Sequence, residues 1–335
     1  MKLERFDTID FFRGIAVLIM IIANSTPYLF DFSNLNLIRI IFSLAAPIFI
    51  FIAGFTTQMN KINKKPESLT RIIQILIIAI FIDFFIWHSI PLFTFDVLYL
   101  IGFSKIILFL FNKFNLTKEK IIVIIVSIGL FILLSKIINY RFIIPDLSVS
   151  EFYKNPLIYF QSGVLQRLFY DGWFPIFPWF IFIVLGSYAY DNLNYNTKTT
   201  SILILIIGFL LMIFFYFYYY NSSFPVREKY YEIWYPLNGF KLILPVSICL
   251  IIYGLLFFYK KINFGIINIL GQNSLFAYLL NAIIDSIFDS YHFFNLELNQ
   301  RILLFIISLI TIIILTYSIS LLKLNKLDRK STRLN

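Results

Sequence analysis

Apolar runs of about 20 residues recur along the whole chain, and this repetition constrains the fold more than any other feature. A run of this length is what an α-helix needs to cross the hydrocarbon core of a bilayer. Hydrophobic residues make up 60% of the 335 residues and charged residues only 14%. A soluble domain carries about 25% charged residues. The sequence therefore predicts an all-α, polytopic integral membrane protein in which residues 1–335 form a single transmembrane helix bundle.

The apolar runs divide into about ten predicted spans. These spans are residues 8–30, 37–59, 69–90, 94–114, 120–138, 174–190, 199–219, 240–259, 265–288 and 301–322. An acidic and a basic side chain beside the apolar core are unusual for a signal peptide, so we expect the first span to be retained as a helix.

Lysines and arginines gather in alternate loops between the spans. One set includes Lys61, Lys64, Lys65, Lys260 and Lys261, whereas the loops "DFSNLN" and "HSIPLFTFD" contain no lysine or arginine. The positive-inside rule then places both termini in the cytoplasm, which fits an even number of spans. These loops also account for much of the net charge of +10, so we expect no nucleic-acid partner. The abundance of Ile, Asn, Lys and Phe is typical of an A+T-rich prokaryotic genome, and we expect a multi-pass protein of the cell membrane.

The first span carries a stripe of polar side chains. Arg13 and Asn24 are eleven positions apart and therefore nearly eclipsed on a helix, and Asp10 lies on the same broad face. Ionisable groups in hydrocarbon cost several kcal/mol unless they pair or meet water. The stripe is expected to face the bundle interior. Asp10 and Arg13 either anchor the helix end as an ion pair, or Arg13 presents its donors to an anionic ligand that enters from the cytoplasm.

A second polar stripe lies in the span of residues 265–288. Ser274, Tyr278, Asn281 and Asp285 follow the spacing i, i+4, i+7 and i+11, which is one face of a helix. Hydrogen bonds between helices would explain Ser274 and Asn281 without a functional role. Asp285 favours a cavity, because a carboxylate at membrane depth is costly elsewhere.

Four other polar residues lie within or at the ends of spans. A buried ion pair is the simplest interpretation of Asp83 and Lys105, because the short loop between their spans makes the spans neighbours. Arg39 is expected to face the same cavity. His88, near the outer end of its span, is a candidate base, although a histidine at the membrane interface often has no catalytic role.

Other sequence signals limit the chemistry. The two histidines are far apart and Cys249 is the single cysteine, so we expect neither a metal site nor an intrachain disulfide. No Walker-type loop or GxSxG motif is present. Pro175 and Pro178 in "FPIFPWFIFIVLG" predict a broken helix, and broken helices at membrane depth usually line a cavity.

Several segments together resemble a known family. "RFDTIDFFRGIAVLIMIIAN" is similar to the opening signature of the heparan-α-glucosaminide N-acetyltransferase-like membrane proteins, in the spacing of Asp10, Arg13, Gly14 and Asn24. "APIFIFIAG", "DVLYLIG", "FPIFPWFIFIVLG" and "LGQNSLFAYLLN" resemble later segments of that family in the same order, over most of the chain.

The resemblance implies an acyl group, most simply acetyl, moving from cytosolic acyl-CoA to a sugar or glycolipid of the cell envelope. Acyl-CoA is then a co-substrate, and no bound cofactor is expected. The family's histidine between the first two helices is missing here, so the candidate bases are Asp285, His88 and Asp31. Acyl transfer requires such a base together with donors for the oxyanion.

The donor's phosphates require cations on the cytoplasmic side, and polar groups near the outer face would hold the acceptor. The predicted donor site comprises Asp10, Arg13, Asn24, Lys61, Lys64 and Arg71, and the predicted acceptor cavity comprises Arg39, Ser274, Tyr278 and Asn281. The expected partners are the bilayer, acyl-CoA and a glycan or glycolipid, and the sequence leaves the oligomeric state open, a homo-oligomer included.

Two other functions remain open from the sequence. A transporter or flippase for a small anionic or sugar-containing solute would use the same polar cavity without chemistry. A non-catalytic relative would keep the fold alone. Retention of Asp10, Arg13 and Asn24 favours the acyltransferase, and the missing histidine favours the alternatives.

Overall fold

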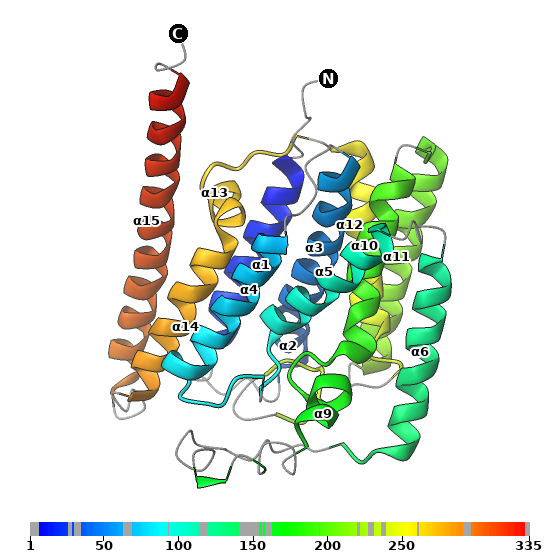
Figure 1. Cartoon of the computed structure of the whole chain (residues 1–335), viewed down its shortest axis with the longest axis horizontal. Helices are drawn as coiled ribbons and strands as arrows, with labels where there is room; N and C mark the ends of the chain where they lie inside the picture. The colour runs from blue at the N-terminus through cyan, green and yellow to red at the C-terminus, as the bar shows by residue number, and fades with distance from the viewer. Residues whose placement is uncertain are drawn as a thin grey trace.

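The protein is an all-helical bundle (Figure 1). The computed structural model describes residues 7–25, 29, 35–62, 69–92, 94–113, 119–140, 154–155, 157, 163–193, 195–219, 222–226, 231–235, 239–259, 261–290 and 296–331. Within these ranges the regular elements are helices, with no β-strand among them. The predicted all-α class is therefore confirmed for the described residues.

The helices follow one another through the bundle in chain order. They are α1 (Asp7–Ser25), α2 (Asn36–Phe42), α3 (Ala45–Ile62), α4 (Leu69–Phe81), the π-helix η2 (Ile82–Ile86), α5 (Val97–Lys113), α6 (Lys120–Ile137), α9 (Val164–Gln166), the π-helix η3 (Arg167–Asp171), α10 (Ile176–Leu193), α11 (Lys198–Tyr219), α12 (Ile243–Phe258), α13 (Ile266–Gln272), α14 (Ser274–Ser290) and α15 (Leu298–Ser331). The start of α1 and the end of α15 lie at the same end of the bundle (Figure 1).

The helices are long and apolar enough for a multi-pass membrane protein. Seven helical stretches among the described residues meet the length and hydropathy needed to cross a bilayer, and the bent pair α13–α14 would make eight. Val97–Phe111 and Ile243–Phe258 are shorter apolar helices. Each of the ten predicted ranges overlaps one of these helices or helix pairs. The number of helices that cross the membrane stays a prediction, as does the location of both termini in the cytoplasm.

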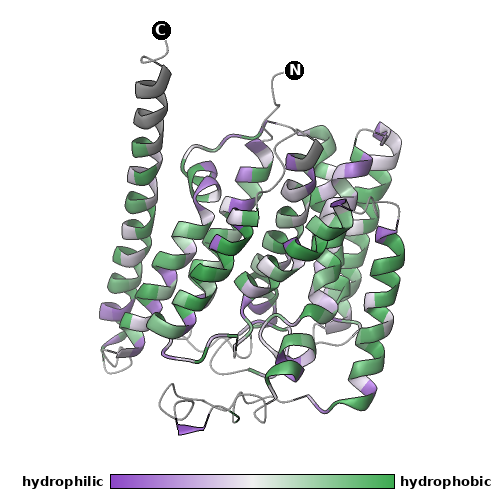
Figure 2. Cartoon of the chain, viewed as in Figure 1, coloured by the Kyte–Doolittle hydropathy of each residue, from purple (hydrophilic) through white to green (hydrophobic). Residues whose placement is uncertain are grey.

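The helices divide into an inner and an outer set. In the most apolar 18 residues of α1, of the α2–α3 stretch and of α10, 56–61% of the residues are buried. The corresponding share is 17% in α6, α11 and α15. Hydrophobic residues run along the length of α6 and α15, and hydrophilic ones gather toward helix ends (Figure 2). Apolar faces of this size are unfavourable in water, so we infer that α6, α11 and α15 face lipid.

Glycines bring the inner helices into close contact. A Cβ atom at Gly54 would lie 1.8 Å from the carbonyl oxygen of Ile183, and one at Gly186 would lie 1.9 Å from that of Phe51. These reciprocal contacts join α3 to α10. Small residues at helix interfaces let backbones approach closely in membrane bundles, so the glycines that end "APIFIFIAG" and "FPIFPWFIFIVLG" have a packing explanation.

Replacement of Gly54 by alanine is expected to destabilise the bundle by about 1–3 kcal/mol, because a backbone carbonyl cannot rotate out of the way. Gly129→Ala is the matched control, since nothing lies within 4 Å of a Cβ at Gly129; that change should be neutral or stabilising by about 0.5–1 kcal/mol. Thermal unfolding in detergent would compare the two variants. Equal stability of both would contradict the close-packing argument.

Two local expectations from the sequence are wrong. Asp83 accepts hydrogen bonds from the Leu92 N–H (3.1 Å), the Thr94 hydroxyl (3.0 Å) and the Tyr99 hydroxyl (2.7 Å). Lys105 is not its partner. It lies six residues beyond Tyr99 on α5, about 1.7 helical turns, and faces a pocket instead. The loop after η2 and Tyr99 of α5, rather than a cation, satisfy the buried Asp83 side chain.

The second wrong expectation concerns α10. The predicted break is present, because Phe177 has non-helical backbone angles (φ −99°, ψ 123°). The helix after the break does not line the pocket, however. Trp179 lies edge-on to Trp234 with ring centroids 5.3 Å apart, and Phe182 lies beside it in the core. This part of α10 therefore packs in the aromatic core.

Candidate active site

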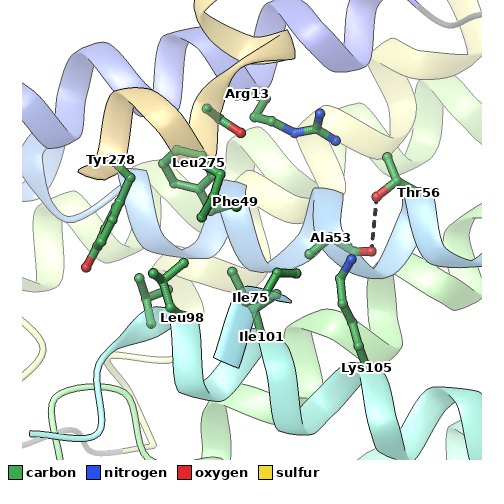
Figure 3. Close-up of a pocket in the computed structure, with 12 residues that line it drawn as sticks. Arg13, Phe49, Ala53, Thr56, Ile75, Leu98, Ile101, Lys105, Leu275 and Tyr278 are labelled. Atoms are coloured by element: carbon green, nitrogen blue, oxygen red, sulfur yellow. Dashed lines mark hydrogen bonds between the residues drawn. The ribbon is translucent and has the colours of Figure 1, made fainter. Parts of the chain in front are cut away.

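A pocket of about 210 Å³ lies between α1, α3, α4, α5 and α14. Its walls are mainly apolar, with a few polar side chains, which is the usual composition of a small-molecule site. The lining residues are Arg13, Phe49, Ala53, Thr56, Ile75, Val97, Leu98, Ile101, Lys105, Ser274, Leu275 and Tyr278 (Figure 3). Pockets for drug-sized ligands have volumes of about 300–1,000 Å³, so this smaller pocket suits one end of a larger molecule.

One end of the pocket is cationic. Arg13 of α1 and Lys105 of α5 extend toward this end beside Thr56 (Figure 3). Arg13 lies 3.5 Å from the Asp10 carboxylate and donates to the Gly271 carbonyl at 3.4 Å. The Thr56 hydroxyl donates to the carbonyls of its own helix. The two cations are therefore the groups at this end that can attract an anion.

The other end of the pocket is built around Tyr278 of α14, which lies near Leu98 (Figure 3). The Tyr278 hydroxyl donates a hydrogen bond to Oδ2 of Asp96. Asp96 directly precedes α5, and its carboxylate also accepts from the backbone N–H groups of Val97 and Leu98. A carboxylate held in this way can take a proton from the pocket through the hydroxyl.

The two ends are separated by a defined distance. Leu98 and Lys105 lie on the same helix seven residues apart, which corresponds to about 10 Å along the axis. An anionic group at the cations and a second reactant at Tyr278 can therefore lie in one continuous cavity.

A break in a helix places α14 against this cavity. The helices α13 and α14 meet at Asn273 with a bend of 88°. On the α13 side, a Cβ at Gly271 would lie 1.8 Å from the Asp10 carbonyl oxygen, so α13 lies directly on α1. On the α14 side, Ser274 and Tyr278 line the pocket. Discontinuous membrane helices commonly line cavities in this manner.

The two predicted polar stripes meet in part. Arg13 from the first stripe and Ser274 and Tyr278 from the second line the same pocket. Asn281 and Asp285 lie farther along α14 and are buried, and the Asn281 amide donates to Asp285 at 2.7 Å. The structure therefore brings the start of the second stripe to the pocket, and its later residues bond to each other.

Other predicted site residues lie away from the pocket lining. Asn24 is half-buried at the far end of α1, about 16 Å along the axis from Arg13. Arg71 is exposed on α4, and His88 is exposed in a left-handed conformation (φ 51°) beyond η2. Asp31 and Lys64 lie outside the described residues, as does the Lys61 side chain.

Arg39 has a different environment from the predicted cavity. It is fully buried in α2, and its guanidinium donates to the carbonyls of Phe224, Pro225 and Tyr231 at 2.6–2.8 Å. These carbonyls belong to the segment between α11 and α12. Arg39 holds this segment against the bundle and does not line the pocket.

Two pocket features were not assigned to the site from the sequence. Lys105 was expected in an ion pair, and Asp96 was noted only within "DVLYLIG". An acidic residue directly before an apolar helix is a helix-capping signal, and that signal could have drawn attention to Asp96 but not to its partner on α14.

Comparison with known families decides the identity of this bundle. The family model described as heparan-alpha-glucosaminide N-acetyltransferase, catalytic, matches residues 5–210, which is more than half of the chain. The chain belongs to the heparan-alpha-glucosaminide N-acetyltransferase family. The match includes the pocket walls from α1, α3, α4 and α5, whereas α14 lies beyond it. No curated protein matches the chain.

Proposed function

We propose that the protein is a membrane acetyltransferase that takes an acetyl group from cytosolic acetyl-CoA. The acceptor would be an amine or hydroxyl of a sugar or glycolipid of a prokaryotic cell envelope. Family membership supports the reaction class. The observation that carries the proposal is one cavity with two cations at one end and a tyrosine–carboxylate pair at the other.

The cationic end suits the donor. Arg13 and Lys105 would attract the anionic acetyl-CoA to this end of the pocket. Ser274 adds the N-terminus of α14, where helix dipoles favour negative charge. Since the pocket holds about 210 Å³, the acetyl end would enter and the nucleotide would remain outside, near the predicted cytoplasmic loops with Lys61 and Lys64.

The test is equilibrium binding of radiolabelled acetyl-CoA to the purified full chain in detergent. Loss of a charged hydrogen-bond donor costs about 1.5–3 kcal/mol, so Arg13→Ala should weaken binding by about 10–100-fold. Lys136→Ala removes an exposed cation from α6, outside the pocket lining, and should leave binding unchanged.

The outcomes separate the functions. Saturable binding that Arg13→Ala weakens and Lys136→Ala does not would support the acetyltransferase and its donor site. Absence of saturable binding at millimolar acetyl-CoA would overturn the proposal and favour a transporter or a non-catalytic relative.

A further inference from the structure

We infer that Tyr278 is the catalytic residue that receives the acceptor's proton. Asp96 is the carboxylate that accepts the tyrosine's own proton in the same step. The inference rests on the proposed function and adds the acid–base chemistry of the acceptor end. No motif in the sequence marks this pair, whose members are 182 residues apart.

The contacts give the two residues different positions. Tyr278 lines the pocket and can touch an acceptor there. Asp96 does not line it, but Val97 and Leu98, which follow it directly, do. The carboxylate therefore lies behind the tyrosine hydroxyl at the pocket wall, and the hydroxyl is the group between acceptor and carboxylate.

The other carboxylates near the pocket are engaged elsewhere. Asp10 faces Arg13 at the cationic end. Asp83 accepts from Leu92, Thr94 and Tyr99. Among the described residues, Asp96 is the carboxylate that a pocket-lining hydroxyl contacts. General-base catalysis requires such hydrogen-bond reach before any other property.

The step balances with the groups present and water. The lone pair of the acceptor nitrogen or oxygen attacks the thioester carbonyl carbon, and the new bond forms as negative charge moves to the carbonyl oxygen. The acceptor's proton passes to the Tyr278 oxygen while the Tyr278 proton passes to Asp96. Collapse of the intermediate breaks the C–S bond, and the CoA thiolate takes a proton from water. Asp96 then returns its proton through Tyr278 to the hydroxide that remains.

A structural role for Asp96 must be separated from this chemical one, because the carboxylate also caps α5. Asparagine caps a helix as well as aspartate does, but it cannot take a proton. Asp96→Asn therefore keeps the cap and removes the base, whereas Asp96→Glu keeps a carboxylate that can accept a proton.

The experiment measures thiol release from acetyl-CoA by the purified full chain, with glucosamine as the probe acceptor. Asp96→Asn and Tyr278→Phe should each lower kcat by about 10²–10⁴-fold, with the acetyl-CoA Kd and the Tm near their wild-type values. Asp96→Glu should recover part of the rate. Tyr317→Phe is the matched control, since Tyr317 is exposed on the lipid-facing α15.

Each result has a distinct meaning. A kcat that survives Asp96→Asn, or a loss of kcat accompanied by equal losses in acetyl-CoA binding and Tm, would overturn the inference and leave the proposed function in place. Failure of the wild-type protein to bind acetyl-CoA or release thiol would remove both.

Discussion

Replacement of Arg39 by alanine is expected to destabilise the protein by about 3–5 kcal/mol. The guanidinium is fully buried and donates to three backbone carbonyls. Hydrogen bonds to charged groups contribute about 1.5–3 kcal/mol each, and orphaned buried acceptors add a desolvation cost. The contributions are not additive, so we expect a total at or below the lower end of their sum.

The charge of Arg39 also affects its surroundings outside the membrane-spanning helices. Burial raises the pKa of Glu232 to about 7, and the nearby Arg39 charge opposes this rise. The Arg39 guanidinium also lies over the Phe224 ring, 5.6 Å from its centroid. Loss of Arg39 removes these contacts together with its hydrogen bonds to the segment between α11 and α12, so the described part of this segment should pack less tightly against the bundle.

Thermal unfolding in detergent and limited proteolysis would measure both effects. Arg39→Lys should recover only part of the stability, because one ammonium cannot reproduce the planar fork of donors. Arg71→Ala removes an exposed arginine and should change stability by less than about 0.5 kcal/mol. An Arg39→Ala protein as stable as Arg71→Ala would contradict the clamp.

Replacement of Lys120 by alanine is also expected to cost about 1.5–3 kcal/mol, because the partly buried Asp191 loses a charged hydrogen-bond donor and keeps the donor of Gln58. The Lys120 ammonium, which is 1% exposed, lies 2.5 Å from Asp191 and donates to the Ser187 hydroxyl at 2.7 Å. Gln58 donates to the other Asp191 oxygen. The network joins α6 to α3 and α10.

A paired replacement distinguishes the ion pair from packing. Lys120→Met with Asp191→Leu should be close to neutral, since apolar pairs of similar size often replace buried ion pairs without loss. Lys113→Ala removes an exposed lysine from α5 and should have little effect. A Lys120→Ala variant that unfolds at the wild-type temperature would show that the network contributes no stability.

The sequence predicted the helices and part of the pocket for identifiable reasons. Helical periodicity relates residues on one helix, so it correctly grouped Ser274 with Tyr278 and marked the inward face of Arg13. It could not indicate that Tyr278 meets Asp96, because that contact joins two helices. The same limit led to the wrong pairing of Asp83 with Lys105, which assumed that neighbouring helices place their charges at the same depth.

The distribution of charges among the loops predicts topology, but it does not predict the environment of an individual cation. Lys120 belongs to a basic loop in the sequence, but the fold buries it against Asp191. Arg39 begins a predicted span and was expected in a cavity, but backbone carbonyls of a distant loop surround it. Backbone acceptors have no residue signature, so a clamp of this kind cannot be predicted from side-chain chemistry.

The central claim is that acetyl-CoA enters the pocket between α1, α5 and α14. The most direct measurement is the rate at which a polar maleimide labels a Ser274→Cys variant, with and without acetyl-CoA. The native Cys249 is 2% exposed and should label slowly. Thr197→Cys, at an exposed position before α11, controls for effects of the nucleotide on the reagent. We predict that acetyl-CoA slows labelling at position 274 but not at position 197. A labelling rate at position 274 that is the same with saturating acetyl-CoA as without it would contradict the account.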